Sequence, residues 1–195
     1  MSKRITFQFE DDLDYQMQAI HSTVELFRGL SRHVDGIYRP NRIRKVGEGD
    51  PVRNNDIVVG SRLLENLRKV QLSNDLFADN VLAEGNNFTI EMETGTGKTY
   101  VYLRTILELY QEYGFRKFMI VVPSIAIRKG VEKSMEQLTD HFKRLYNIDI
   151  GKHSFIYDSN NPKQISSKLV ESNDLSICVL NIQAFNKDTN KIRKE

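Results

Sequence analysis

Apolar side chains follow a helical spacing near the start of the chain. Between residues 13 and 27 they recur every three or four positions, at Leu13, Met17, Ile20, Val24 and Phe27. This spacing predicts an amphipathic helix, which Gly29 can end. Before it, residues 5–9 alternate apolar and polar side chains, and this alternation predicts a short strand.

From residue 88 onwards, strand patterns and helix patterns alternate. Predicted strands cover residues 88–92, 117–122, 153–157 and 175–180, and predicted helices cover residues 98–110, 124–146 and 163–171. The runs "KFMIVV" and "LSICVL" are continuously apolar, which is typical of strands covered on both faces. The alternation predicts an α/β fold with a largely parallel sheet and right-handed crossovers.

Residues 31–82 separate these two regions and are less regular. Residues 31–55 are basic and predict a loop or insertion, whereas residues 61–70 predict a short helix. We therefore predict three parts. These are a strand and helix (residues 1–30), an insertion or linker with a short helix (residues 31–82) and the start of the main α/β domain (residues 83–195).

Composition and charge narrow the function mainly by exclusion. The net charge of +2 does not by itself demand a nucleic-acid partner. Cys178 is the one cysteine, which excludes a disulfide framework or a cysteine-based metal site within the chain. No apolar run approaches the roughly 18 residues of a membrane span, and the first residues lack a signal-peptide core, so we expect a cytoplasmic protein.

A glycine-rich loop, "ETGTGKT" at residues 93–99, joins a predicted strand to a predicted helix. Its glycines allow a tight turn and a close approach to an anion, while backbone N–H groups converge at the positive end of the helix dipole. Lys98 can reach the β- and γ-phosphates of a nucleotide, and the Thr99 hydroxyl can bind Mg²⁺. The predicted phosphate-binding residues are Thr94, Gly95, Thr96, Gly97, Lys98 and Thr99. Met92 stands where the full eight-residue motif has its first glycine, so the loop is a variant.

Two flanking features bear on the ligand. Gln16 follows Tyr15 in the first predicted helix, and a glutamine amide can pair with the N6 and N7 edge of adenine; the alternative is a solvated helix residue. The second feature is "FMIVVPSIAIRKG", where a buried strand ends at Pro123 and a helix begins at Ser124. That helix start, with Arg128 nearby, can hold a nucleic-acid phosphate or can be an ordinary strand-to-helix junction.

Taken together, these motifs resemble a known family. Tyr15-Gln16, "METGTGKT", "IVVPSIAIRKG" and "VLNIQAFNK" occur in this order. The order resembles the first motor domain of superfamily 2 helicases, and within them the Res (restriction) subunit of type III restriction–modification enzymes. Helicases of this kind usually have a small or apolar residue at the Met92 position. The resemblance extends to both ends of the chain and is least specific over residues 31–82.

The resemblance implies a RecA-like P-loop domain that binds ATP and Mg²⁺ and moves along double-stranded DNA. It implies that Gln16 recognises adenine, that Lys98 and Thr99 serve catalysis, and that Ser124, Arg128 and Asn181 lie along the nucleic-acid track. In the family a separate nuclease domain cuts DNA, and a methyltransferase (Mod) partner recognises the target sequence.

Hydrolysis needs an acidic residue at the end of a strand to hold Mg²⁺. No apolar run followed by an Asp-Glu pair occurs after the loop, so we expect a domain truncated before the acidic (Walker B) strand. We expect the chain alone to bind nucleotide weakly and not to turn it over. Three alternatives stay open: a small-molecule kinase, a nucleotide-binding module without catalysis, and a helicase-like protein without nuclease activity.

Overall fold

The computed structural model describes residues 10, 12–34, 37–40, 61–79, 81–82, 86–158, 161 and 163–184. The chain divides into two compact units. One comprises Asp14–Arg116, and the other comprises Met1–Leu13 together with Lys117–Glu195. Each unit is described separately below. The strand predicted at residues 5–9 lies outside the described residues.

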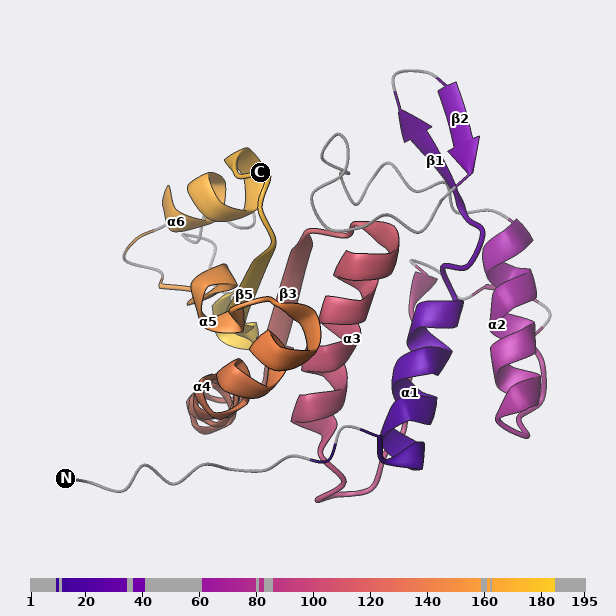
Figure 1. Ribbon diagram of the computed structural model, residues 1–195, viewed down its shortest axis with the longest axis horizontal. Helices are drawn as coiled ribbons and strands as arrows, with labels where there is room; N and C mark the ends of the chain where they lie inside the picture. Colours follow the sequence, from indigo (N-terminus) through magenta and orange to yellow (C-terminus); the bar gives the residue numbers. More distant parts are fainter. Residues whose placement is uncertain are drawn as a thin grey trace. The chain divides into compact units, whose positions relative to one another are not determined.

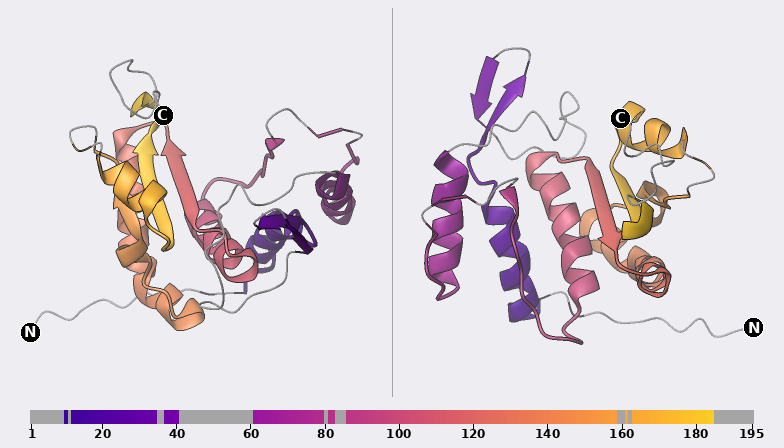
Figure 2. Two further views of the ribbon diagram at one scale, coloured as in Figure 1. Left: turned by 90° about the horizontal axis from the view of Figure 1, so that it is seen from above. Right: turned by 180° about the vertical axis from the view of Figure 1, so that it is seen from behind.

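Helices dominate the described part of the Asp14–Arg116 unit. They are α1 (Asp14–Glu25), α2 (Ser61–Ser73) and α3 (Lys98–Tyr113), and α1 lies between the other two (Figures 1 and 2). The helices predicted at residues 13–27, 61–70 and 98–110 are therefore confirmed. Ile20 on α1 and Leu103 and Leu107 on α3 are fully buried, so the seam between α1 and α3 belongs to the core of this unit.

An aromatic cluster closes one end of that seam. The ring of Phe27, just after α1, meets the ring of Phe115 edge-on at a centroid distance of 5.0 Å and lies 6.2 Å from the ring of Tyr113. Offset and edge-on pairs of this kind stabilise a fold beyond the apolar area that they bury. The cluster fixes the C-terminal end of α1 against the C-terminal end of α3.

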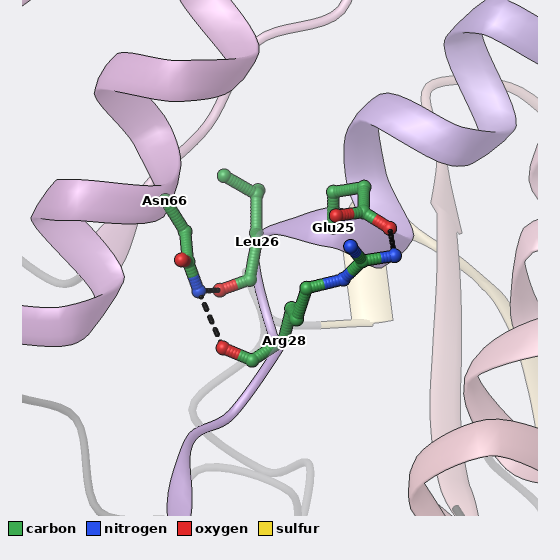
Figure 3. Close-up of polar contacts among 4 residues, drawn as sticks. All are labelled: Glu25, Leu26, Arg28 and Asn66. Atoms are coloured by element: carbon green, nitrogen blue, oxygen red, sulfur yellow. Dashed lines mark hydrogen bonds and ion pairs between the residues drawn. The ribbon is translucent and has the colours of Figure 1, made fainter.

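A buried asparagine joins α2 to the end of α1. Asn66 is 5% exposed, and its Nδ2 donates to the backbone oxygens of Leu26 (3.0 Å) and Arg28 (2.8 Å), as Figure 3 shows. The last carbonyl groups of a helix and the turn after it lack partners within the helix, so a side chain from elsewhere must satisfy them when they are buried. The Arg28 guanidinium in turn pairs with Glu25 at the surface.

Two predictions for this unit are wrong. Residues 31–40, predicted as loop or insertion, contain the antiparallel pair β1 (Ser31–Val34) and β2 (Ile37–Pro40). Residues 88–92, predicted as a strand, form no strand, and Phe88 and Ile90 are 36% and 49% exposed. A strand exists only with a hydrogen-bonding neighbour, and no described strand pairs with these residues.

The Lys117–Glu195 part of the second unit contains a parallel sheet. Its strands are β3 (Lys117–Val122), β4 (Ser154–Ile156) and β5 (Ser176–Asn181), in the order β3-β5-β4. Both pairs are parallel, and Val122 faces Asn181 in the register. The predicted parallel sheet and the α/β class are confirmed for the described residues.

The central strand and the edge strand differ in burial. All of β5 up to Leu180 is buried, as the apolar run predicted. On β3, however, Met119 and Val121 are 51% and 46% exposed, so the prediction that this strand is covered on both faces is wrong. Met119 and Val121 lie two positions apart and therefore point to the same face of the sheet, which is open to solvent at these two residues.

The helices of this unit match the predicted pattern with local changes. α4 (Ile125–Tyr146) buries Val131, Leu138 and Phe142 as predicted. Ile127 and Leu145 are exposed instead, and the ring of Tyr146 takes the buried position at the last turn, 6.2 Å from the ring of Phe142. A short helix, α5 (Ile150–His153), precedes β4.

The helix predicted at residues 163–171 is two elements. It starts as α6 (Lys163–Ile165) and continues as a π-helix (Ser166–Glu171). In this wider turn the Lys168 carbonyl accepts from Ser176 Oγ (2.7 Å) and from Lys117 Nζ (3.2 Å), so both neighbouring strands hold it. No helix among the described residues is both long and apolar enough to cross a bilayer.

We expect Asn66→Ala to lower the free energy of unfolding by about 1–3 kcal/mol, because two backbone carbonyl groups lose their donor, one of them in a buried contact. Urea unfolding followed by circular dichroism measures the change. Lys69→Ala, at an exposed position of the same helix, is the control and is expected to stay within about 0.5 kcal/mol of the parent. Equal stability of the two variants would contradict the role given to Asn66.

Candidate functional site

The side chain of Gln16 lies against the glycine loop, although 80 positions separate it from Thr96. Gln16 sits in the first turn of α1, is 7% exposed, and its Nε2 donates to the Thr96 carbonyl oxygen at 2.9 Å. Packing of α1 on α3 holds it there, because the loop leads directly into α3. The structure thus brings together the two features that the sequence analysis selected separately.

Both glycines of the loop have a backbone conformation that other residues rarely adopt. Gly95 and Gly97 each have φ of +85°, in the left-handed region. A Cβ added at Gly95 would meet no atom within 4 Å, so only the backbone angle constrains that position. A Cβ at Gly97 would lie 2.5 Å from Gln16 Nε2, so a side chain at this position would displace the Gln16 amide from its contact with the loop.

The loop is closed by bonds to one carbonyl group. The Glu93 oxygen accepts from Thr96 Oγ1 at 2.7 Å and from Lys98 Nζ at 2.5 Å. Lys98 is exposed, so its ammonium group is accessible from solvent while it folds back over the loop. A neutral carbonyl is a weaker partner for an ammonium group than an anionic oxygen, so an arriving phosphate can take Lys98 over.

Thr99, the predicted Mg²⁺ ligand, is half-buried in the first turn of α3. Burial raises the pKa of Tyr102, one turn further along the helix, and a hydrogen bond between the side chains of Tyr102 and Thr99 partly opposes that rise. The Thr99 hydroxyl is thereby held toward Tyr102. The described residues contain no group of three or more His, Cys, Asp or Glu side chains that could hold a metal ion.

The predicted nucleic-acid residues come together at the carboxyl edge of the sheet, in the other unit. Ser124 caps α4, since its Oγ accepts from the Ile127 N–H at 3.3 Å, and Arg128 follows half-buried on the same helix. On the neighbouring strand, Asn181 ends β5 next to Val122 in the register. Parallel strands place their carboxyl ends along one edge, which is where such sheets bind ligands.

A hydrogen bond ties the two strand ends to each other. Gln183, in the short 3₁₀ helix after β5, donates from Nε2 to the Pro123 carbonyl oxygen at 3.1 Å. Within the described part of the chain, the Oδ1 atom of Asn181 is buried and accepts no hydrogen bond. Residues 185–187 of the "VLNIQAFNK" motif lie outside the described residues.

Sequence reasoning did not foresee the roles of Gln183, Tyr102 and the Glu93 carbonyl. Gln183 lies inside a motif that the sequence analysis quoted, so its position was available, but nothing in the spacing indicates which strand end it contacts. Tyr102 lies three residues after Thr99, a spacing that places two side chains on one helix face, and that signal could have found it.

We expect Gly97→Ala to destabilise the Asp14–Arg116 unit more than Gly95→Ala does. Both variants strain a left-handed backbone by about 1–2 kcal/mol, but a methyl group at position 97 also displaces the Gln16 amide. In a Gln16→Ala background the two alanine variants should become similar, and a double-mutant cycle on urea unfolding measures that coupling. A zero coupling energy would contradict the contact.

Comparison with known proteins places the sequence in a family. The family model described as "Type III restriction enzyme, res subunit" matches residues 11–195. The Res subunit of EcoPI from Escherichia phage P1 is 27% identical over 170 residues, which cover 85% of this chain and 17% of that protein. The Res subunit of EcoP15I from Escherichia coli is 32% identical over 111 residues, which cover 55% of this chain and 11% of that protein.

A third relative, the Res subunit of StyLTI from Salmonella typhimurium, is 47% identical over 62 residues, which cover 31% of this chain and 6% of that protein. The chain thus spans less than a fifth of the length of each of these relatives. Because the family model covers nearly every residue, including the loop and both strand ends, the chain belongs to the family of type III restriction enzyme Res subunits.

Proposed function

We propose that this chain carries the ATP-binding site of a DNA-translocating superfamily 2 ATPase, the restriction subunit of a type III restriction–modification system. The observation that carries the proposal is the hydrogen bond between Gln16 and the Thr96 carbonyl, which joins a base-recognition amide to a phosphate loop. The matching family model supports the class of enzyme.

The phosphate end of the nucleotide is assigned to the loop. Gly95 and Gly97 give the backbone its turn, and the first N–H groups of α3 have no partner one turn earlier in the helix. These donors and the helix dipole favour an anion at this end of α3. Lys98 then exchanges the Glu93 carbonyl for the β- and γ-phosphate oxygens.

A bound Mg²⁺ ion would be held by the Thr99 oxygen together with phosphate oxygens, and it would neutralise charge that develops on the phosphates. An Asp-Glu pair at a strand end is also expected for hydrolysis, and no apolar run after the loop ends in such a pair. We propose that these 195 residues alone bind nucleotide without turning it over.

The base end is assigned to Gln16. Its Nε2 has two hydrogens, and one of them is engaged with Thr96. The second hydrogen and the Oε1 acceptor together match the N6 and N7 edge of adenine. Gln16 therefore contacts the loop and the base through one amide, so that binding of the base is coupled to the position of the Thr96 carbonyl in the loop.

The carboxyl edge of the β3-β5-β4 sheet is proposed as part of the DNA track. Ser124 and Arg128 offer a helix N-terminus and a guanidinium group, both of which bind phosphate oxygens in protein–DNA complexes. The buried Oδ1 of Asn181 is an acceptor at the same edge. Double-stranded DNA, a methyltransferase (Mod) partner and cleavage by a nuclease domain belong to the proposed whole enzyme, and the three-part division at residues 30 and 82 stays a prediction.

We expect Lys98→Ala to weaken binding of ATP with Mg²⁺ by about tenfold or more, because hydrogen bonds to charged groups contribute about 1.5–3 kcal/mol each. Isothermal titration calorimetry on the chain measures the affinity. Lys69→Ala removes an exposed lysine from α2 and should leave the affinity unchanged. If both variants bind ATP as the parent does, the phosphate loop is not the site.

We expect Gln16→Ala to reduce the preference for ATP over GTP by about fivefold or more, since a bidentate base contact discriminates by about 1–3 kcal/mol. The ratio of the two affinities isolates the base, because loss of the Thr96 bond affects both nucleotides equally. Gln18→Ala, which removes an amide on the same helix that bonds to Asn74, is the matched control. An unchanged ratio in Gln16→Ala would assign adenine recognition to other residues.

A further inference from the structure

The β1–β2 hairpin has no part in the function proposed above. Its strands, labelled in Figure 1, pair only with each other, and no third described helix or strand makes more than a marginal contact with either. A two-stranded hairpin without a further strand or a helix packed on it is at best marginally stable in water. Contacts with a binding partner are therefore the kind of stabilisation that this hairpin lacks.

Two arginines are partners across this hairpin. Arg32 on β1 and Arg39 on β2 occupy the same register position. Partners in an antiparallel pair lie on the same face, with Cα atoms about 4.5–5.5 Å apart. Only residues 35 and 36 join the two strands, and so short a connection fixes the register. The two arginines therefore cannot be separated by a shift of one strand.

The strands themselves supply no counter-charge for this pair. β1 reads SRHV and β2 reads IYRP, so neither strand contains an acidic residue. Like charges at directly opposite positions destabilise a pair of strands, whereas opposite charges stabilise it. An anion bound by Arg32 and Arg39 would add an attraction to each arginine and offset their repulsion.

The sequence around the hairpin stays basic when the neighbouring charges are counted. Residues 31–45 carry five basic side chains and one acidic, a net charge of +4, whereas the whole chain has +2, so the other 180 residues together have −2. Residues 46–60 carry Arg53 and three acidic residues, a net charge of −2, but the helix α2 that follows has +2. On the other side of the hairpin, Arg28 is paired with Glu25.

The phosphate backbone of a nucleic acid matches this pair of positive charges. Each strand of DNA carries one negative charge per about 3.4 Å of helix axis, a repeat on the scale of the distance between two register partners. Guanidinium groups bind phosphate oxygens through charge-assisted, often paired, hydrogen bonds. Contacts to phosphates carry no sequence information, which suits a protein that moves along DNA.

We propose that the β1–β2 hairpin is a second contact to the DNA backbone, in which Arg32 and Arg39 together bind phosphate oxygens of double-stranded DNA. The inference rests on the proposed function for the nature of the polymer and adds a contact outside the sheet edge. The hairpin belongs to the Asp14–Arg116 unit, whereas Ser124 and Arg128 belong to the other unit. The two contacts can therefore be removed separately.

The salt dependence of DNA binding tests the proposal. Fluorescence anisotropy of a labelled duplex of arbitrary sequence gives the affinity of the chain, without nucleotide, between about 50 and 200 mM salt. We expect Arg32→Ala/Arg39→Ala to bind about tenfold or more weakly at the lower salt and to reduce the slope of log K against log salt by about 2, since each phosphate contact contributes about 0.9. An unchanged slope, or a parent chain that binds no DNA, would overturn the proposal.

Two control variants separate a phosphate contact from a change in net charge or in folding. Lys143→Ala/Arg144→Ala removes the same charge from the exposed C-terminal end of α4 and should keep the slope of the parent. Arg32→Lys/Arg39→Lys keeps the charge and should also keep the slope; a slope as low as that of the alanine pair would assign the arginines a structural role. Alanine variants that aggregate with the slope intact would mean that the arginines only protect strand edges.

Two comparisons separate this contact from the other proposals. If Arg128→Ala lowers the slope and the hairpin variant does not, the sheet edge binds DNA and the hairpin proposal is wrong; the reverse result supports the hairpin and removes Arg128 from the track. Polyglutamate imitates an acidic protein surface, and competition as strong as that of unlabelled DNA would assign the hairpin to a protein partner instead. Neither measurement depends on the nucleotide site, which Lys98→Ala tests independently.

Discussion

One hydrogen bond connects the two ends of the proposed nucleotide site. Gln16 on α1 and Thr96 in the loop are 80 positions apart, and the amide of the first donates to the carbonyl of the second. The bond forms only if α1 and α3 lie side by side, and only if position 97 carries no side chain. A local loop geometry therefore depends on packing that is set elsewhere in the unit.

That packing is supported at the far end of the same helix. Asn66 satisfies the carbonyls that follow α1, and the Phe27 ring packs against Phe115 after α3. Neither group is near the loop, yet both fix the C-terminal end of α1 and so help to set the direction of its axis. The helix α1 is thus held at its N-terminal end by the bond from Gln16, and at its C-terminal end by the Asn66 cap and the aromatic cluster. The site is in this sense a property of two packed helices rather than of the loop alone.

Sequence patterns foresaw the parts of the fold that depend on local periodicity. The helices α1, α3 and α4 were predicted from their apolar spacing and from glycine or serine at their boundaries, and the strands β3 and β5 from their continuous apolar runs. The strand predicted at residues 88–92 was wrong, because an alternating pattern carries no information about which neighbour completes the ladder. The β1–β2 pair was missed for the opposite reason, since a short polar hairpin is defined by its pairing and hardly by its pattern. For the site, the loop and Gln16 were found separately, but the contact between Gln16 and the loop at Gly97 is a long-range one that spacing does not encode.

The single thiol of this chain lies at the centre of the sheet, on β5. Cys178 is completely buried, and burial raises its pKa to about 11, so thiol reagents find neither access nor thiolate while the strand stays paired on both sides. The rate at which a reagent labels this sulfur consequently measures how often the central strand opens transiently. It is a native reporter that follows the sheet without any added dye, and it remains silent toward events confined to the helical unit.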